Sequence, residues 1–214
     1  FCKMGADAPD VESAKELRSF FETIQKLNAE GKILAYHDKS DGGLYTTALE
    51  MAFAGHTGVT LDISKLAGSE LEILFNEELG AVLQVATENV NAVLSAFENA
   101  GLKECVSDIG TLNDSYEYRI GNYAENISDL RAIWSDTTRR ISALRDNPEC
   151  AESEYKLKLE EADPGITPKV TFDISVTHDY ESRPKMAILR EQGVNGEVEM
   201  AAAFNKAGFE SIDV

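Results

Sequence analysis

Residues 33–54 constrain the fold most strongly, because they read as a strand, a turn and a helix in immediate succession. Residues 33–36 form a short apolar run of the kind found in buried strands. The turn HDKSDGG follows at residues 37–43, and an amphipathic stretch begins at Leu44. A strand that leads directly into a helix gathers backbone N–H groups and the positive end of the helix dipole at one point, which suits a phosphate.

The residue types in this turn fit the same interpretation. Gly42 and Gly43 let a ligand approach the backbone closely. Asp38 offers a carboxylate oxygen, the kind of ligand that Mg²⁺ prefers. The alternative is an ordinary glycine-containing turn in which Asp38 and Ser40 serve as caps. The residues by themselves leave both interpretations open.

The first 145 residues alternate between helix and strand patterns. Ser13 begins a capping box, and the helix that follows is expected to end at Gly31. Asn113 and Asp114 favour a hairpin between the two strands that flank them. The pattern predicts an α/β protein with a mixed sheet and helices packed on it. Further helices are predicted for residues 44–54, 71–75, 90–97 and 126–144, and strands for residues 33–36, 59–63, 80–85, 105–112 and 116–120.

Composition changes after residue 145. Residues 146–184 contain four prolines and an acidic stretch, so we predict a connecting segment on the surface, in which residues 169–176 are compatible with an edge strand. The pattern then predicts a strand at residues 185–189, a helix capped by Asn195 that runs to Lys206, and a strand at residues 211–214. This is one βαβ unit, and by itself it is expected to pack poorly.

The charge balance argues against two classes of partner. Lys and Arg number 20 against 38 Asp and Glu, which gives a formal net charge of -18. Nucleic acids and anionic membrane surfaces both require basic patches, so neither is an expected partner. No apolar run of about 18 residues is present, so no membrane span is expected. The three cysteines have neither zinc-site spacing nor the number of a disulfide framework, and they favour a reducing cytoplasm.

Several stretches, in order along the chain, resemble one family. The first is YHDKSDGGL at residues 36–44, followed by EMAFAGH at residues 50–56. LFNEELGA, LRDNP, ADPG and PKMAILREQGVN follow later in the chain. Together they resemble the large, single-chain phosphoribosylformylglycinamidine synthases, also called FGAM synthetases. The last stretch resembles the opening of the glutaminase domain of that family.

The resemblance implies that the chain is a piece of a longer enzyme. Residues 1–145 would form the second domain of the type found at the C-terminus of aminoimidazole ribonucleotide (AIR) synthetase. Residues 146–184 would be a linker, and residues 185–214 the truncated start of a class I glutamine amidotransferase domain. The remaining domains of the same enzyme would be the partners. The first residue, which is not methionine, and the apolar last residues fit this expectation.

The resemblance also implies a reaction. The family makes formylglycinamidine ribonucleotide from formylglycinamide ribonucleotide, glutamine and ATP, a carbon–nitrogen ligase step of purine biosynthesis that releases ADP, phosphate and glutamate. The cysteine, histidine and glutamate of its glutaminase would lie beyond Val214, so no catalytic residue is expected in this chain. The synthetase half seen here would carry an auxiliary nucleotide site. By this resemblance Asp38 is a Mg²⁺ ligand and Ser40 is a contact of ATP or ADP.

Three neighbours of these residues have alternative roles. His37 is expected to make a structural hydrogen bond, with proton transfer as the alternative. Lys39 either reaches a phosphate or is solvated, and Asp41 either stabilises the turn or supports the metal through a water molecule.

The isolated chain is expected to be inactive and to bind nucleotide weakly or not at all. The reason is that the other Mg²⁺ ligands would come from a preceding domain. Two alternatives to this reading of the whole chain are a stand-alone ATP-dependent enzyme of the AIR synthetase superfamily and a structural or interaction module without a ligand.

Overall fold

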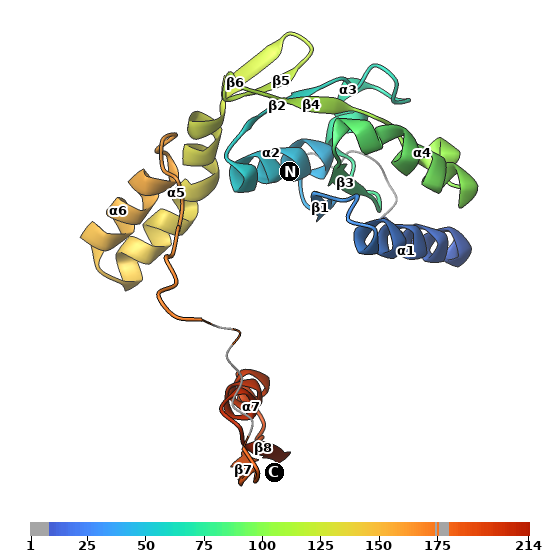
Figure 1. Ribbon diagram of the computed structural model, residues 1–214. Coiled ribbons are helices and arrows are strands. Elements are labelled where there is room, and N and C mark those ends of the chain that lie inside the picture. The colour runs from blue at the N-terminus through green and yellow to red at the C-terminus, as the bar shows by residue number, and fades with distance from the viewer. Residues whose placement is uncertain (1–8, 174, 176–179) are drawn as a thin grey trace. The chain divides into compact units, whose positions relative to one another are not determined.

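The computed structural model describes residues 9–173, 175 and 180–214. The chain divides into two compact units, one ending at Asp163 and the other beginning at Pro164. Each unit has its own strands and helices, shown by label in Figure 1.

The first unit alternates helices and strands as the sequence predicts. Its elements are α1 (Ala14–Ala29), β1 (Ala35–Asp38), α2 (Gly43–Gly55), β2 (Gly58–Leu61), α3 (Glu70–Phe75), β3 (Ala81–Gln84), η1 (Thr87–Asn89), α4 (Val90–Asn99), η2 (Lys103–Cys105), β4 (Gly110–Asn113), β5 (Glu117–Ile120), β6 (Tyr123–Asn126), α5 (Ile127–Arg145) and α6 (Pro148–Lys158), where η marks a 3₁₀ turn. The Ser13 hydroxyl accepts a hydrogen bond from the Glu16 N–H at the start of α1, and Gly31 follows the end of that helix with φ +66°.

The strands of this unit form two sheets. Four strands lie in the order β4-β2-β5-β6, with β2 and β5 parallel and the two outer pairings antiparallel. Strands β1 and β3 form a separate antiparallel pair in which Asp38 lies opposite Ala81. The mixed sheet of an α/β protein is therefore confirmed.

The predicted hairpin between residues 105–112 and 116–120 is wrong. Strand β2 lies between β4 and β5, so that Val59 is opposite Leu112 on one side and Tyr118 on the other. The chain does turn after Asn113, but the next strand, β5, pairs with the opposite edge of β2 instead of with β4. The local hairpin is instead formed by β5 and β6, and Gly121 between them adopts φ +56°, a backbone conformation that suits glycine.

One core lies between α2 and the four-stranded sheet. Ala52 and Phe53 of α2 are buried in the same cluster as Leu61 of β2 and Tyr118 of β5. Tyr118 is fully buried, and its hydroxyl donates a hydrogen bond of 2.9 Å to the Tyr45 carbonyl oxygen. This contact satisfies the polar end of the ring, and burial raises the pKa of Tyr118. Helix α2 is thereby fixed against the sheet.

A second core joins α1 to α4. Ile24 and Leu27 of α1 pack with Val93 and Phe97 of α4, and Leu83 of β3 lies against the cluster. This core supports the β1–β3 pair, because β3 contributes to it directly. Figure 1 shows β1 and β3 next to α1 and α4 within the first unit.

Helix α6 is a correction to the sequence interpretation, which expected prolines to exclude helix after residue 145. Pro148 occupies the first turn of α6, where its missing N–H has no intrahelical partner to lose. The Asn147 side chain accepts hydrogen bonds from the N–H groups of Glu149 and Cys150. The segment is therefore helical as far as Lys158.

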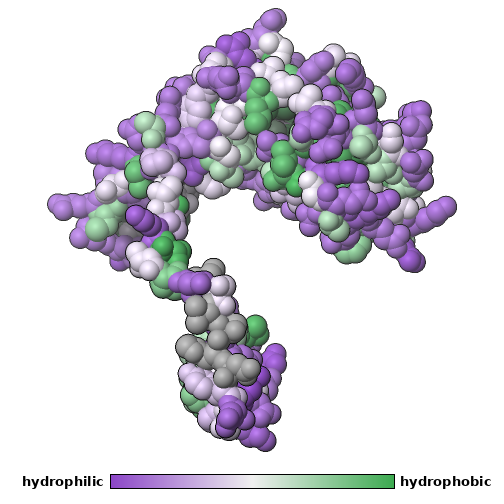
Figure 2. All heavy atoms as spheres, in the orientation of Figure 1, coloured by the Kyte–Doolittle hydropathy of each residue, from purple (hydrophilic) through white to green (hydrophobic). Residues whose placement is uncertain are grey.

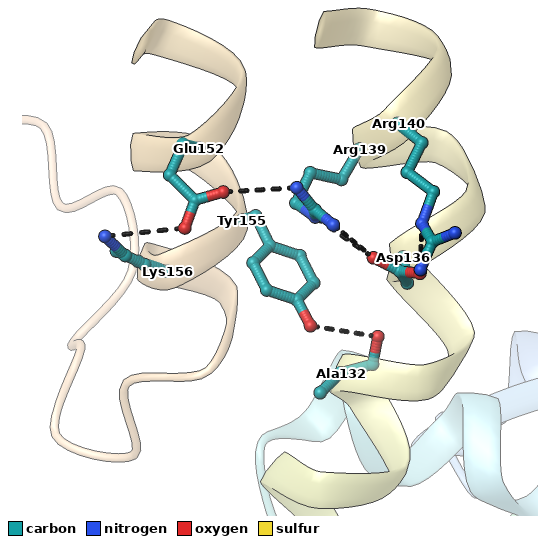
Figure 3. A network of polar contacts seen from close by, with 7 residues as sticks. All are labelled: Ala132, Asp136, Arg139, Arg140, Glu152, Tyr155 and Lys156. Carbon is teal, nitrogen blue, oxygen red and sulfur yellow. Dashed lines mark hydrogen bonds and ion pairs between the residues drawn. The ribbon is translucent and has the colours of Figure 1, made fainter. Parts of the chain in front are cut away.

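Helices α5 and α6 form a hairpin held by a polar network, shown in Figure 3. Arg139 of α5 donates to Asp136 at 2.6 Å and to Glu152 of α6 at 3.3 Å, and its guanidinium lies 5.1 Å from the centre of the Tyr155 ring. The Tyr155 hydroxyl donates to the Ala132 carbonyl oxygen. The hydrogen bond from Arg139 holds the pKa of Asp136 below its ordinary value.

The second unit is the predicted βαβ arrangement. Strands β7 (Lys185–Ile188) and β8 (Glu210–Asp213) are parallel, with α7 (Glu197–Lys206) between them in the chain. The residue at the start of α7 is Gly196 with φ +101°, and not Asn195 as the sequence predicts. Residues 169–173 and 175 form no strand, and the remainder of the predicted 169–176 strand lies outside the described residues.

Apolar side chains remain exposed at several places, and Figure 2 shows hydrophobic residues scattered among hydrophilic ones on the visible face. The apolar face predicted for the helix at residues 126–144 is buried mainly at Ile127, whereas Trp134 is 52% exposed and Leu144 is 89% exposed. Across the described residues, none of the helices combines the length and the apolarity that a membrane span requires.

Candidate functional site

The predicted motif forms the loop between β1 and α2. Both ends of strand β1 lie two residues later than predicted, so the strand includes His37 and Asp38. Ser40 and Asp41 follow in the loop and are exposed. Gly42 is the residue before the first helical turn and adopts φ +81°. The loop thus carries polar side chains outward from the end of a strand.

Gly43 is required by the packing of the protein itself. It is buried and adopts φ +64°, and a Cβ atom there would lie 2.6 Å from the carbonyl oxygen of Asn76 and 2.7 Å from that of Leu74. The close approach that the sequence assigns to a ligand is therefore made at Gly43 by residues 74–76. This contact brings the second sequence motif, LFNEELGA, against the first.

The side chain of Glu77 lies at the N-terminus of α2. Its Oε1 accepts a hydrogen bond of 3.0 Å from the Gly42 N–H, and the Gly43 N–H donates to the Ser40 carbonyl oxygen at 2.9 Å. A carboxylate is stabilised at this end of a helix. Two of the amides that were expected to face a phosphate are thus engaged within the chain, and the Glu77 side chain caps the start of α2.

Lys39 also holds the two motifs together. Its backbone N–H donates to the Gly80 carbonyl oxygen at 2.8 Å, and its Nζ donates to the Asn76 side-chain oxygen. Partial burial lowers the pKa of Lys39, an effect that the nearby Glu78 opposes. The Lys39 side chain is therefore tied to Asn76 rather than freely solvated.

Asp38, Ser40 and Asp41 are exposed members of the motif. The Asp38 side chain is 72% exposed, and one of its oxygens lies 3.8 Å from Nδ1 of His37. The carboxylate is therefore available as one oxygen ligand for a hard cation. Among the described residues, no three or more His, Cys, Asp or Glu side chains come together as a metal site. Asp38 alone fits Mg²⁺ only as a partial ligand set.

Two hydrogen bonds to Glu50, one of them from His37, link three elements. Nε2 of His37 lies 2.7 Å from Oε2 of Glu50 on α2, and Oε1 of the same carboxylate accepts a bond of 3.1 Å from Nε1 of Trp134 on α5. Glu50 belongs to the EMAFAGH motif, but no local pattern in the sequence connects it to Trp134, 84 residues further along. Neither the contact of His37 with Glu50 nor that of Glu50 with Trp134 was predicted from the sequence.

The remaining histidines and cysteines form no further site in the part of the chain described. His56 ends α2 with φ +51°, and its ring lies 5.3 Å from that of Tyr116. Cys105 and Cys150 are free and exposed. Cys2 and His178 lie outside the described residues.

The loop after β7 is tied to the adjacent strand. The Arg190 N–H donates to the Val214 carbonyl oxygen at 2.9 Å, and the Arg190 side chain pairs with Asp213 at 3.2 Å.

Comparison with known protein families identifies most of the first unit. Residues 3–121 match the family described as AIR synthase related protein, C-terminal domain. This match covers more than half of the chain and contains the whole β1–α2 loop. The chain belongs to this family. The AIR synthase-related domain is followed at residues 183–214 by a match to a CobB/CobQ-like glutamine amidotransferase domain. The two families are found in the order that the sequence resemblance implied, and that resemblance is confirmed.

Solved structures of low sequence identity are also similar to this chain. PurLQS from Thermotoga maritima is 17% identical with a TM-score of 0.48, and the match covers 55% of this chain and 22% of that one. PurL from T. maritima complexed with ATP is 15% identical with a TM-score of 0.47, covering 56% and 23%. PurL complexed with AMPPCP is 11% identical with a TM-score of 0.47, covering 93% and 30%. This chain spans no more than 30% of the length of these proteins.

Proposed function

We propose that this chain is part of a phosphoribosylformylglycinamidine synthase. Such an enzyme converts formylglycinamide ribonucleotide, glutamine and ATP to formylglycinamidine ribonucleotide, ADP, phosphate and glutamate in purine biosynthesis. The observation that carries the proposal is the presence, in one chain, of an AIR synthase-related domain followed by the start of a glutamine amidotransferase domain. A stand-alone enzyme of the AIR synthetase superfamily is the weaker candidate, because it does not explain the second match.

Within that enzyme we assign the β1–α2 loop to an auxiliary nucleotide site. Asp38 would supply one oxygen ligand to Mg²⁺, and the Ser40 hydroxyl would contact the nucleotide. Their exposure supports these roles, since both side chains are open to a ligand that approaches from outside. Bound Mg²⁺ would supply charge neutralisation to phosphate oxygens.

The other loop residues would act by holding Asp38 and Ser40 in place. Lys39, Gly42 and Gly43 are each tied to residues 74–80, so the loop has little freedom to lose when a ligand binds. The other metal ligands would come from elsewhere in the intact protein, because the described residues gather no group of three or more His, Cys, Asp or Glu side chains around Asp38. The isolated chain would then bind nucleotide weakly and lack catalytic activity.

We propose boundaries at residues 145 and 184 between the AIR synthetase-like domain, the linker and the start of the glutaminase domain, with one addition from the structure. Helix α6 packs on α5, so it belongs with the first unit, and the connecting segment would be confined to residues after Asp163. The partners would be the remaining domains of the same enzyme. The enzyme would be located in the cytoplasm.

The test is to measure bound nucleotide and Mg²⁺ in the intact protein with Asp38→Ala. We expect this variant to lose nucleotide at the auxiliary site, because one oxygen ligand is removed. Asp114→Ala, which changes an exposed acid in the turn after β4, is the matched control and should keep it. Unchanged occupancy in Asp38→Ala would instead favour a plain turn and a structural module.

A further inference from the structure

Three side chains from separate elements form a hydrogen-bonded series at the base of the β1–α2 loop. His37 lies on β1, Glu50 on α2 and Trp134 on α5. The two oxygens of Glu50 are used separately, Oε2 by Nε2 of His37 at 2.7 Å and Oε1 by Nε1 of Trp134 at 3.1 Å. The His37 and Glu50 side chains are 31% and 29% exposed, so solvent competes with the contact only in part.

The chemistry of the three groups fixes the direction of each bond. An indole N–H can only donate, and an ionised carboxylate can only accept. Glu50 therefore accepts from both neighbours, and Nε2 of His37 carries the hydrogen. The same bond sets the orientation of the ring. It places Nδ1 on the side of Asp38, 3.8 Å from the carboxylate oxygen.

Trp134 is held in position independently of Glu50. Its ring lies 5.7 Å from that of Phe53 on α2. One helical turn earlier on α5, Arg131 donates to the Phe53 carbonyl oxygen at 2.8 Å and its guanidinium lies 5.3 Å from the centre of the same ring. Helices α2 and α5 are thus joined around Phe53, and the indole N–H reaches Glu50 from a fixed place.

We propose that Glu50 and Trp134 are positioning residues for His37. They hold its imidazole with Nε2–H in the interior and Nδ1 toward Asp38, and so support a Mg²⁺-nucleotide complex that neither of them touches. The part concerning the ligand rests on the proposed function. The part concerning the ring does not, and it is tested separately. Outer groups that orient residues around a metal typically affect affinity by about 10- to 100-fold.

The first experiment measures the ring itself, without ligand. The chain is labelled with ¹⁵N-histidine, and long-range ¹H–¹⁵N spectra at one mildly basic pH report which ring nitrogen of His37 carries the hydrogen. The chain has three histidines, and His37→Gln assigns the signals. We expect Nε2–H in the wild type and a mixture of the two tautomers in Glu50→Ala. Glu104→Ala, an exposed acid in η2, is the control and should match the wild type.

Trp134→Phe tests the outer member of the series. It preserves an aromatic ring against Phe53 but removes the indole N–H, so we expect a smaller share of Nε2–H on His37. Because this substitution retains the packing, it keeps the proposal testable if Glu50→Ala fails to fold. A His37 spectrum unchanged in both Glu50→Ala and Trp134→Phe would overturn the proposal, whatever the chain binds.

The second experiment measures binding of ATP with MgCl₂ at the auxiliary site of the intact protein. We expect His37→Ala and Glu50→Ala each to weaken binding about tenfold, and the double variant to be no weaker than His37→Ala alone, because Glu50 acts through His37. Additive losses would overturn the positioning role. If Asp38→Ala weakens binding while Glu50→Ala does not, this inference fails and the proposed function stands. If Asp38→Ala has no effect, the proposed function itself fails.

Discussion

Gly43 meets two separate requirements at one residue. Its φ of +64° lies in the left-handed region, and its missing side chain leaves room for the carbonyl oxygens of Leu74 and Asn76. The first requirement is conformational and the second is steric. Gly101 provides a natural comparison, because its φ is +80° and a Cβ atom there would meet no atom of the described residues within 4 Å.

We therefore expect Gly43→Ala to cost about 2–5 kcal/mol, the sum of a left-handed alanine and an overpacked contact. Gly101→Ala should cost only about 1–2 kcal/mol, from the backbone conformation alone. Urea unfolding of the two variants measures both values. Equal losses would show that residues 74–76 move aside without cost, and that the two motifs are not firmly packed together.

Two buried hydroxyls differ in their partners. The Thr47 hydroxyl donates a hydrogen bond of 2.8 Å to the Gly43 carbonyl oxygen. The Ser135 hydroxyl, 3% exposed in the α5–α6 hairpin, has no partner among the residues that the structure describes. We expect Thr47→Val to lower stability by about 1 kcal/mol and Ser135→Ala to leave it unchanged or raise it by up to about 1 kcal/mol. Thermal unfolding distinguishes these signs. A clear loss in Ser135→Ala would mean that the hydroxyl is satisfied by buried water.

Among the elements, the α5–α6 hairpin should respond to acid. The hydrogen bond from Arg139 makes the folded-state pKa of Asp136 lower than the unfolded value of about 3.9. The contribution of this pair is therefore present above about pH 4 and lost as the pH falls through the folded-state pKa. We expect Asp136→Asn to be less stable than the wild type at neutral pH. In urea unfolding followed by circular dichroism, the two should converge as the pH falls through the folded-state pKa of Asp136, and a gap independent of pH would contradict this.

The elements also show what a sequence pattern determines and what it leaves open. The apolar alternation at residues 59–63 and 116–120 correctly predicts two strands. It does not reveal that they are neighbours, because that pairing depends on a contact across more than 50 residues while turn residues report only on adjacent segments. Helix α6 was missed for a different reason. Proline stops a helix from its interior but is favoured at its first position, so Pro148 marks a beginning.

The same limit applies to the candidate site. The exposure of Asp38 and Ser40 in a strand-to-helix loop follows from a local motif and was predictable. The hydrogen bond from Gly42 to Glu77 and the series through Glu50 to Trp134 depend on tertiary packing of distant segments. No local periodicity encodes them, so the roles of Glu77, Glu50 and Trp134 emerged only from the structure.

For the whole molecule, the two units should differ in resistance to proteases. The described residues between Pro164 and Pro184 are all exposed and form no helix or strand. Trypsin should cut first after Lys169 in this segment, because Arg183 precedes a proline and the basic residues of the first unit lie mostly in helices. Mass spectrometry of early products checks this. A first cut within α5, for example at Arg140, would indicate that the hairpin opens more readily than the segment.

The central place of β2 in its sheet has a consequence for the order in which the chain is made. This strand is synthesised about 50 residues before either of its neighbours, so during translation both of its hydrogen-bonding edges stand open. Nothing nearby can close them, because the next strand, β3, pairs with β1. In the nascent chain, β2 thus lacks both of its neighbours or one of them until Ile120 has left the ribosome. Chaperone binding to translating ribosomes should peak in that interval and end once β5 has emerged.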